Sequence, residues 1–219
     1  MVTFHRNAIT PGCTRALEFL KGEVIVQGYY LAGGTALALQ IGHRISTDLD
    51  WFSTDHLLES AERDDFREAL AASGDFAVMG EQDGQLFTRL LGADVSFIHQ
   101  PHRLLDETVD LDGLPLATPT DIGLMKLAAI NSRGTRRDFV DVYCLRDITP
   151  LTRLIELAEI KYADRASFLD ITARALAYFE EAEQQPMPQM LTRVKWSDAR
   201  RYCEEGARWL VRRQRERYG

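Results

Sequence analysis

Residues 31–52 read LAGGTALALQIGHRISTDLDWF, and the order of motifs in this stretch sets the expected fold. A glycine pair precedes a short apolar run that ends at Gly42, as in a helix closed by glycine. The last eight residues, ISTDLDWF, alternate in a way that is typical of a strand with one buried face. A β-rich segment over residues 24–32 leads into the glycines. We therefore expect a strand, a turn, a helix and a second strand in close succession.

The second strand would carry two carboxylates on one face. Alternate side chains of a strand share a side, so Asp48 and Asp50 point one way while Leu49 and Trp51 point toward a core. A cation relieves the repulsion between two such carboxylates most simply, and their hard oxygen atoms suit Mg²⁺ or Mn²⁺ better than zinc. The alternative is the solvated face of an edge strand. The aromatic pair Trp51–Phe52 favours a central strand, where a carboxylate needs a partner.

The glycine pair predicts an anion site. A strand followed by Gly33 and Gly34 and then by a helix start leaves unpaired backbone N–H groups at the positive end of a helix, which suits phosphate. We expect Thr35 to cap this helix and to add a hydroxyl group. Gly-Gly turns before helices are common, so the motif is weak evidence by itself. The sequence contains no P-loop and no dinucleotide-binding glycine motif.

Together, a phosphate site and a metal-binding carboxylate pair fit a nucleoside triphosphate with its metal. The order GGT and then DLD resembles the first motif of the nucleotidyltransferase superfamily. The longer string GGTALALQIGHRISTDLDWF resembles in particular the AbiEii-type nucleotidyltransferase toxins of bacterial abortive-infection and toxin–antitoxin systems. Arg44, between the two motifs, is a candidate for a phosphate or carboxylate contact, whereas we expect a structural role for His43.

A downstream segment, TPTDIGLMKLAAINSRGTRRDFVDVYCL, extends the resemblance. Lys126 is the only charge between Ile122 and Ile130, on a helix that should be largely buried. Its ammonium group must then reach a cleft or a carboxylate, unless it reaches solvent along its aliphatic stem. Arg133 lies two turns further along the same face.

Arg136, Asp138 and Asp141 match the RxDxxD-like motif of the family. The two aspartates are one turn apart and can share a face. The alternative is a carboxylate at a helix start together with an ion pair between Arg137 and Asp141. The resemblance implies that Asp141 organises the basic residues or acts nearer the chemistry. The same resemblance implies that the triphosphate is bound by basic residues of this segment, namely Lys126, Arg133 and Arg136.

One position departs from the superfamily pattern. Many nucleotidyltransferases carry a third carboxylate on a later strand, and here Ser96 of GADVSFI stands at that position. Asp94, two residues earlier, lies on the same strand face and is the candidate for a third metal ligand. The departure leaves both a one-metal and a two-metal site open.

Composition and pattern place these motifs in an α+β protein. The chain has 219 residues and a net charge of −7, which excludes a generally basic nucleic-acid binder but not a local basic groove. The three cysteines have no metal-binding spacing, and the N-terminus has no signal-like apolar run, so we expect a cytoplasmic protein without a membrane span. We expect a nucleotidyltransferase-like mixed sheet with flanking helices over residues 1–115, including a hairpin at Asp83–Gly84. Helices alone should follow over residues 116–219 and contribute Lys126 and the RxDxxD motif.

The resemblance implies a metal-dependent enzyme that transfers a nucleoside monophosphate from a triphosphate. Its cofactor would be Mg²⁺ or Mn²⁺, and its acceptor an RNA, with tRNA as one candidate, or a protein hydroxyl. As a toxin it would be held in check by a cognate antitoxin. The alternative is a catalytically silent nucleotidyltransferase fold that serves as a binding or regulatory module. The missing carboxylate at Ser96 favours this alternative, and retention of the other motifs disfavours it.

Overall fold

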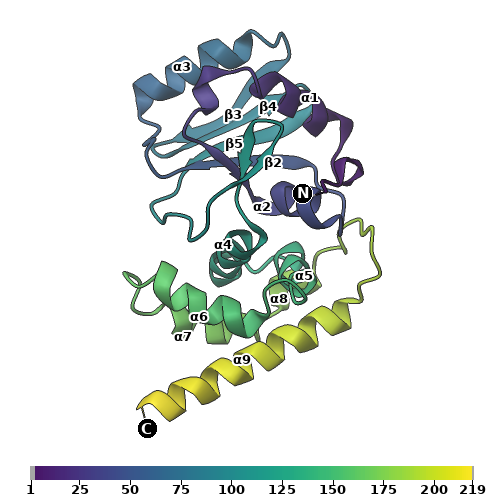
Figure 1. Cartoon of the computed structure of the whole chain (residues 1–219), viewed down its shortest axis with the longest axis vertical. Coiled ribbons are helices and arrows are strands. Elements are labelled where there is room, and N and C mark those ends of the chain that lie inside the picture. Colours follow the sequence, from purple (N-terminus) through teal and green to yellow (C-terminus); the bar gives the residue numbers. More distant parts are fainter. Residues whose placement is uncertain (1–2, 219) are drawn as a thin grey trace. The chain divides into compact units, whose positions relative to one another are not determined.

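The computed structural model of the chain describes residues 3–218. The chain divides into two compact units, of which the first ends at Thr118 and the second begins at Pro119. The first unit contains the sheet and the second is helical (Figure 1). Sequence patterns placed this division after residue 115.

The described residues of the first unit form a seven-stranded sheet in the order β3-β4-β5-β2-β1-β7-β6. The pairs β2–β5 and β1–β7 are parallel and the other four pairs are antiparallel, which makes the sheet mixed. The predicted α+β class is therefore confirmed. The strands are β1 (Tyr30–Ala32), β2 (Asp48–Ser53), β3 (Phe76–Gln82), β4 (Gln85–Leu90), β5 (Ala93–His99), β6 (Val109–Leu111) and β7 (Leu114–Leu116).

Strand β2 is central, as its aromatic residues indicate, because β5 and β1 flank it. Burial alternates along the strand, and the side chains of Leu49 and Trp51 are completely buried. Helix α3 (Ser60–Ala71) covers this apolar face, since its Phe66 ring lies 4.5 Å from the ring of Phe97, which neighbours Trp51 on β5. The edge-strand interpretation of the Asp-x-Asp motif is wrong.

One strand near the N-terminus differs from the sequence prediction, and the helix before it begins at a proline. Helix α1 (Pro11–Leu20) begins at a proline, and Thr10 directly before it is the N-cap residue. The Thr10 hydroxyl accepts a hydrogen bond from the backbone N–H of Cys13. This arrangement suits the first turn of a helix. Residues 24–26 form a short 3₁₀ turn, so the predicted strand over 24–32 is restricted to β1.

The hairpin predicted at Asp83–Gly84 joins β3 and β4 and is confirmed. A second hairpin, β6–β7, was not predicted. It turns at Asp112–Gly113, where both residues have positive φ angles (51° and 89°). Its strands are only three residues long and Pro115 interrupts the second, so no alternating pattern is long enough to indicate them.

The second unit is helical throughout, as predicted. Its core consists of apolar side chains from α4, α5, α6, α7 and α9 and from the segments between them, among them Leu127, Phe139, Leu154 and Leu210. None of the helices described over residues 3–218 is long and apolar enough to cross a membrane. The helices are α4 (Pro119–Ser132), α5 (Arg136–Cys144), α6 (Leu151–Lys161), α7 (Phe168–Ala175), α8 (Glu180–Glu183) and α9 (Trp196–Tyr218).

Candidate functional site

The carboxylate pair lies at the start of β2, on the sheet face opposite the core of Leu49 and Trp51. Asp48 and Asp50 are both half-buried. On the neighbouring strand β5, Asp94 is the register partner of Asp48, and Ser96 is the partner of Asp50. Partners on adjacent strands project to the same side, so one face carries all four of these polar residues.

Helix α2 (Gly33–Ile41) begins directly against Asp50. Gly33 has a φ of +67°, and a Cβ atom there would lie 2.6 Å from Oδ2 of Asp50. Glycine is therefore needed both for the backbone conformation and for the close approach. The turn that precedes α2 therefore lies directly against the Asp50 carboxylate. The phosphate site that the Gly-Gly motif predicts stays a prediction.

The cap of α2 differs from the prediction. The helix starts at Gly33 with Ala32 as its N-cap residue, so Thr35 is the third helical residue and does not cap. The Thr35 hydroxyl is buried and donates to the backbone carbonyl of Asp48. Thr35 thus ties the first turn of α2 to the start of the carboxylate strand. The predicted helix end is confirmed, since Gly42 adopts the left-handed conformation and donates to the carbonyl of Ala38.

Gly34 makes room for a side chain of the protein itself. A Cβ atom at this position would overlap Nη2 of Arg44 and would lie 3.2 Å from Oγ of Ser46. Arg44 is only 4% exposed. The sequence interpretation of Gly34 as open space for a phosphate is therefore incomplete, because a buried guanidinium group already lies there.

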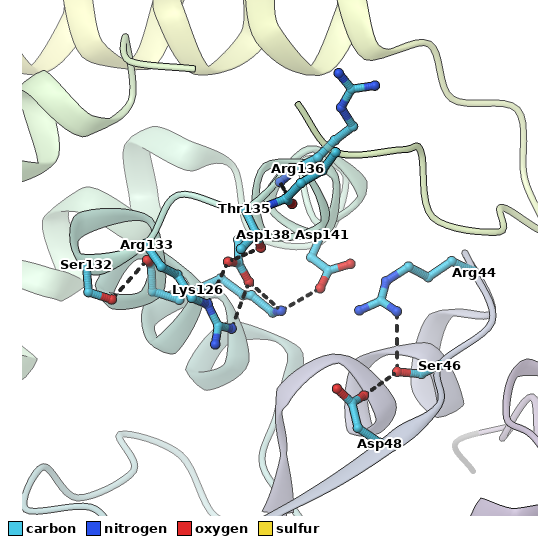
Figure 2. A network of polar contacts seen from close by, with 12 residues as sticks. Arg44, Ser46, Asp48, Lys126, Ser132, Arg133, Thr135, Arg136, Asp138 and Asp141 are labelled. Atoms are coloured by element: carbon cyan, nitrogen blue, oxygen red, sulfur yellow. Dashed lines mark hydrogen bonds and ion pairs between the residues drawn. The ribbon is translucent and has the colours of Figure 1, made fainter. Parts of the chain in front are cut away.

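Arg44 connects to the carboxylate pair through Ser46, as Figure 2 shows. Nη1 of Arg44 donates to Oγ of Ser46 at 3.3 Å and to the carbonyl of Ile45 at 3.1 Å. Oγ of Ser46 donates in turn to Oδ1 of Asp48 at 3.3 Å. Ser46 was not predicted as a site residue. Its position two residues before Asp48, on the same strand face, was the available signal.

Asp94 has a different environment. Its carboxylate accepts from Nη1 of Arg89 on β4 at 2.6 Å, and its side chain is 64% exposed. Within residues 3–218 no group of three or more histidine, cysteine, aspartate or glutamate side chains is arranged to hold a metal ion. The predicted third carboxylate is thus next to Asp48 in register but is not part of a preassembled three-ligand cluster.

The first unit fits a divalent cation at Asp48 and Asp50. Two oxygen-donor side chains share one strand face, and Gly33 leaves the space beside Asp50 that a Cβ atom would fill. Mg²⁺ is bound in proteins by one or two carboxylates together with substrate phosphates and water. A pair of aspartates therefore suffices for such a site.

In the second unit, Lys126 is buried between two aspartates of α5. Its Nζ lies 2.9 Å from Oδ1 of Asp138 and 2.7 Å from Oδ2 of Asp141 (Figure 2). Lys126 is 5% exposed and both aspartates are completely buried. The interpretation that Lys126 extends to solvent is wrong, and the prediction that its ammonium group reaches a carboxylate is confirmed. Asp138 and Asp141 share a face, as their spacing predicted.

Asp138 is the centre of this cluster. It also accepts from Nε of Arg133 at 3.1 Å and from the Thr135 hydroxyl at 2.5 Å. Burial, the largest single influence, raises the pKa of Asp138, but the charge of Lys126 and the hydrogen bonds from Arg133 and Thr135 outweigh it and lower that pKa to about 2. Asp138 is therefore ionised at any physiological pH.

Arg133 and Arg136 have different surroundings. The Arg133 side chain is 53% exposed although Asp138 anchors it. The guanidinium group of Arg136 donates to the carbonyls of Ala182 and Glu183, and it lies 4.8 Å from the ring centroid of Trp196. A phosphate contact by Arg136, as the sequence predicts, would have to replace these contacts. Arg133 is the better placed of the two for a ligand.

Comparison with known proteins identifies the family. The model of the nucleotidyl transferase AbiEii toxin family, assigned to type IV toxin–antitoxin systems, matches residues 91–210, which include Lys126 and the RxDxxD motif. An uncharacterized protein of Aquifex aeolicus (strain VF5) is 31% identical over 209 residues, which cover 92% of this chain and 93% of that protein.

A solved structure supports the same fold. MenT4, a nucleotidyltransferase toxin from Mycobacterium tuberculosis H37Rv, superposes with a TM-score of 0.55 at 16% identity, over 90% of this chain and 82% of that one. The family match covers more than half of the chain and contains the ionic cluster described above. The chain is therefore a nucleotidyltransferase that belongs to the AbiEii toxin family.

Proposed function

We propose that this protein is a metal-dependent toxin that transfers a nucleoside monophosphate from a nucleoside triphosphate to an RNA or a protein hydroxyl. One observation carries the proposal. The carboxylates of Asp48 and Asp50 share a face of the central strand, with the glycine turn of α2 packed against Asp50. Hard carboxylate oxygens beside a helix start suit a triphosphate with its Mg²⁺ or Mn²⁺.

In this proposal Asp48 and Asp50 would hold a divalent cation. The cation would supply positive charge against the transferring phosphoryl group and the leaving pyrophosphate. Ser46 orients the Asp48 carboxylate, and Thr35 keeps the backbone of Asp48 against the first turn of α2. The backbone N–H groups at that turn, in Gly33 and Gly34, face the triphosphate.

Arg44 contributes positive charge in the same unit. Its guanidinium group is fixed beside the start of α2 by Ser46 and by the carbonyl of Ile45. A preorganised cation at this position offsets phosphate charge without a reorganisation cost when the reaction occurs. Arg44 is therefore proposed as a phosphate contact.

The helical unit contributes cations that its buried aspartates hold in place. Asp138 and Asp141 compensate Lys126, and Asp138 also anchors Arg133 while leaving half of that side chain exposed. We assign Arg133 and Lys126 to triphosphate binding, as the family resemblance implies. Asp141 acts by organising Lys126. This assignment takes the first of the two roles that the resemblance allows for Asp141.

The biological setting is proposed from the family match, and the acceptor is proposed from the sequence resemblance. A type IV toxin–antitoxin family supports a growth-inhibiting toxin with a cognate antitoxin. The acceptor is then an RNA, with tRNA as one candidate, or a protein, and the reaction takes place in the cytoplasm. The two-carboxylate arrangement favours a single metal ion, with Asp94 as the candidate ligand if a second one binds.

The test is transfer of label from each NTP to total RNA and to total protein, in the presence of Mg²⁺. Asp48→Asn and Asp50→Asn should each lower transfer by more than about 100-fold. Substitution of a residue that only hydrogen-bonds to a metal ligand already lowers metal affinity or activity by about 10- to 100-fold, and loss of the ligand itself should cost more. Both variants should stay folded, since each removes one of two like charges. Asp65→Asn, at an exposed position on α3, is the matched control.

Full transfer by both site variants would refute the metal assignment. Nucleotide binding by the wild-type protein without transfer to either acceptor would support the catalytically silent alternative. Activity that depends on Asp94 and responds to a second Mg²⁺ would instead establish a two-metal site.

A further inference from the structure

The sheet face that carries the carboxylate pair continues onto β4. Asp50 is the register partner of Ser96 on β5, and Ser96 is the partner of Phe87 on β4. The three residues therefore form a row across neighbouring strands on one face (the strands are labelled in Figure 1). Adjacent strands are about 4.8 Å apart, so Phe87 lies two spacings, roughly 10 Å, from Asp50 at the backbone.

Phe87 exposes its ring on this face. The residues on either side of it, Leu86 and Thr88, are 0% and 2% exposed, whereas Phe87 is 37% exposed. A solvated sheet face normally alternates polar residues with the buried ones. Phe87 is thus an exception on β4, because an apolar side chain stands at an exposed position. It also lies in one row with the Asp50 carboxylate.

The strand opposite Phe87 gives the ring one supporting neighbour. Cδ2 of Phe87 lies 3.8 Å from the position that a Cβ atom of Gly80 would take, so the ring packs against bare backbone on β3. Aromatic side chains cover glycines on sheets in this way. The ring therefore packs against the β3 backbone on one side, and its other side remains exposed to solvent.

Groups that can recognise a base edge lie on the same face. Gln85, two residues before Phe87, is the register partner of Ile98 and of Gln82. Nε2 of Gln82 donates to Oε1 of Gln85 at 3.0 Å, which orients both amides at the strand ends. Amide side chains donate to and accept from base edges, and aromatic rings stack on the faces of bases.

We propose that the exposed ring of Phe87 is a stacking platform for a nucleobase during nucleotidyl transfer. The inference depends on the proposed function, because it requires a phosphate bound at Asp48 and Asp50. A nucleotide whose phosphate is held there extends across Ser96 to the ring. The base belongs either to the incoming nucleoside triphosphate or to the terminal nucleotide of an RNA acceptor.

The experiment compares the KM for the NTP and the KM for RNA in the wild type, Phe87→Ala, Phe87→Tyr and Phe87→Leu. Stacking on an aromatic side chain contributes about 1–3 kcal/mol per base, so Phe87→Ala should raise one of the two KM values by about 5- to 150-fold. Phe87→Tyr should restore it, and Phe87→Leu should not, because leucine keeps apolar area but has no π face. The KM that changes identifies the source of the base.

Met79→Ala is the matched control, because Met79 is an exposed apolar residue of the same hairpin, 68% exposed. A structural role of Phe87 in covering Gly80 would lower the melting temperature of Phe87→Ala without a selective KM effect. Phe87→Trp adds an independent readout, since stacking of a base should quench its fluorescence relative to the wild-type tryptophans.

Equal KM values for the wild type and Phe87→Leu, or equal losses in Phe87→Leu and Met79→Ala, would overturn the platform. Failure of the proposed function has a different signature, namely no transfer by the wild-type protein. In that event fluorescence of Phe87→Trp, titrated separately with NTP and with RNA, still tests the platform, and a signal that neither ligand quenches at saturation would refute it.

Discussion

The carboxylates of β2 and the ionic cluster of α4 and α5 differ in how their charges are compensated. Asp48 and Asp50 are half-buried on one sheet face, and Asp50 lies against a glycine turn. Asp138 and Asp141 are completely buried and share one lysine. Of the two pairs, only the first is partly exposed to solvent.

From this difference we expect the β2 pair to matter mainly for activity and the helical cluster mainly for folding. A buried ion pair is strongly destabilised when one partner is removed, because the other charge is left without compensation in a poorly polarisable surrounding. A half-exposed carboxylate that serves a metal costs little stability when it is neutralised. Substitutions in the helical cluster should therefore act first on folding, and substitutions on β2 should act first on activity.

The largest effect on stability is expected for Lys126→Ala. Two buried aspartates would lose their common cation, which should lower the free energy of unfolding by about 3–5 kcal/mol. Lys161→Ala is the matched control, because Lys161 forms a second buried pair, 2.7 Å from Asp121. Urea denaturation of both variants checks the prediction.

Comparison of the two lysine variants also isolates the proposed phosphate contact. If Lys126 binds triphosphate, Lys126→Ala should lose more NTP affinity than Lys161→Ala does. Calorimetry under conditions where both variants are folded measures this difference. Equal affinities in the two variants would restrict Lys126 to support and leave Arg133 as the phosphate contact of this unit.

The pH dependence of stability gives the next largest effect. The pKa of Asp138 is about 2 in the folded protein against an ordinary value of 3.8. Because the pKa is lower in the folded state, the ionised carboxylate stabilises the fold at any pH above the pKa of the unfolded chain. This contribution of about 2 kcal/mol disappears as the pH falls from about 5 through 2. Unfolding free energies of wild type and Asp138→Asn, measured from pH 6 to pH 2, should converge toward acid. Parallel curves would show that the folded carboxyl titrates normally.

The smallest of these effects is expected for Gly34→Ala, which tests the first unit. The new methyl group would overlap the buried guanidinium of Arg44, at a cost of about 1–3 kcal/mol. Displacement of Arg44 should also reduce transfer, since Ser46 and Asp48 depend on its position. Gly22→Ala, where the nearest atom would be a carbonyl 3.9 Å away, is the control. Unchanged transfer in Gly34→Ala would remove Arg44 from the proposed phosphate site.

The sequence by itself was sufficient for the local features of the protein. The alternation in ISTDLDWF identified a strand with Asp48 and Asp50 on one face, and the aromatic pair at its end favoured a central position. Asp83–Gly84 identified a hairpin. The apolar pattern after Pro119 predicted helices, and the isolation of Lys126 predicted a buried partner. Each of these features depends on periods and turn chemistry that extend over only a few neighbouring residues.

Only the tertiary structure decided which residues meet. Register places Asp94 beside Asp48 and Phe87 beside Ser96, and no local pattern specifies register between strands. The guanidinium of Arg44 lies where a Cβ atom of Gly34 would be, and Asp138 shares Lys126 with Asp141. Such contacts depend on packing between segments far apart in the chain. The sequence therefore determined which chemical groups this protein carries, and the packing of its strands and helices decided which of those groups are buried and which lie side by side.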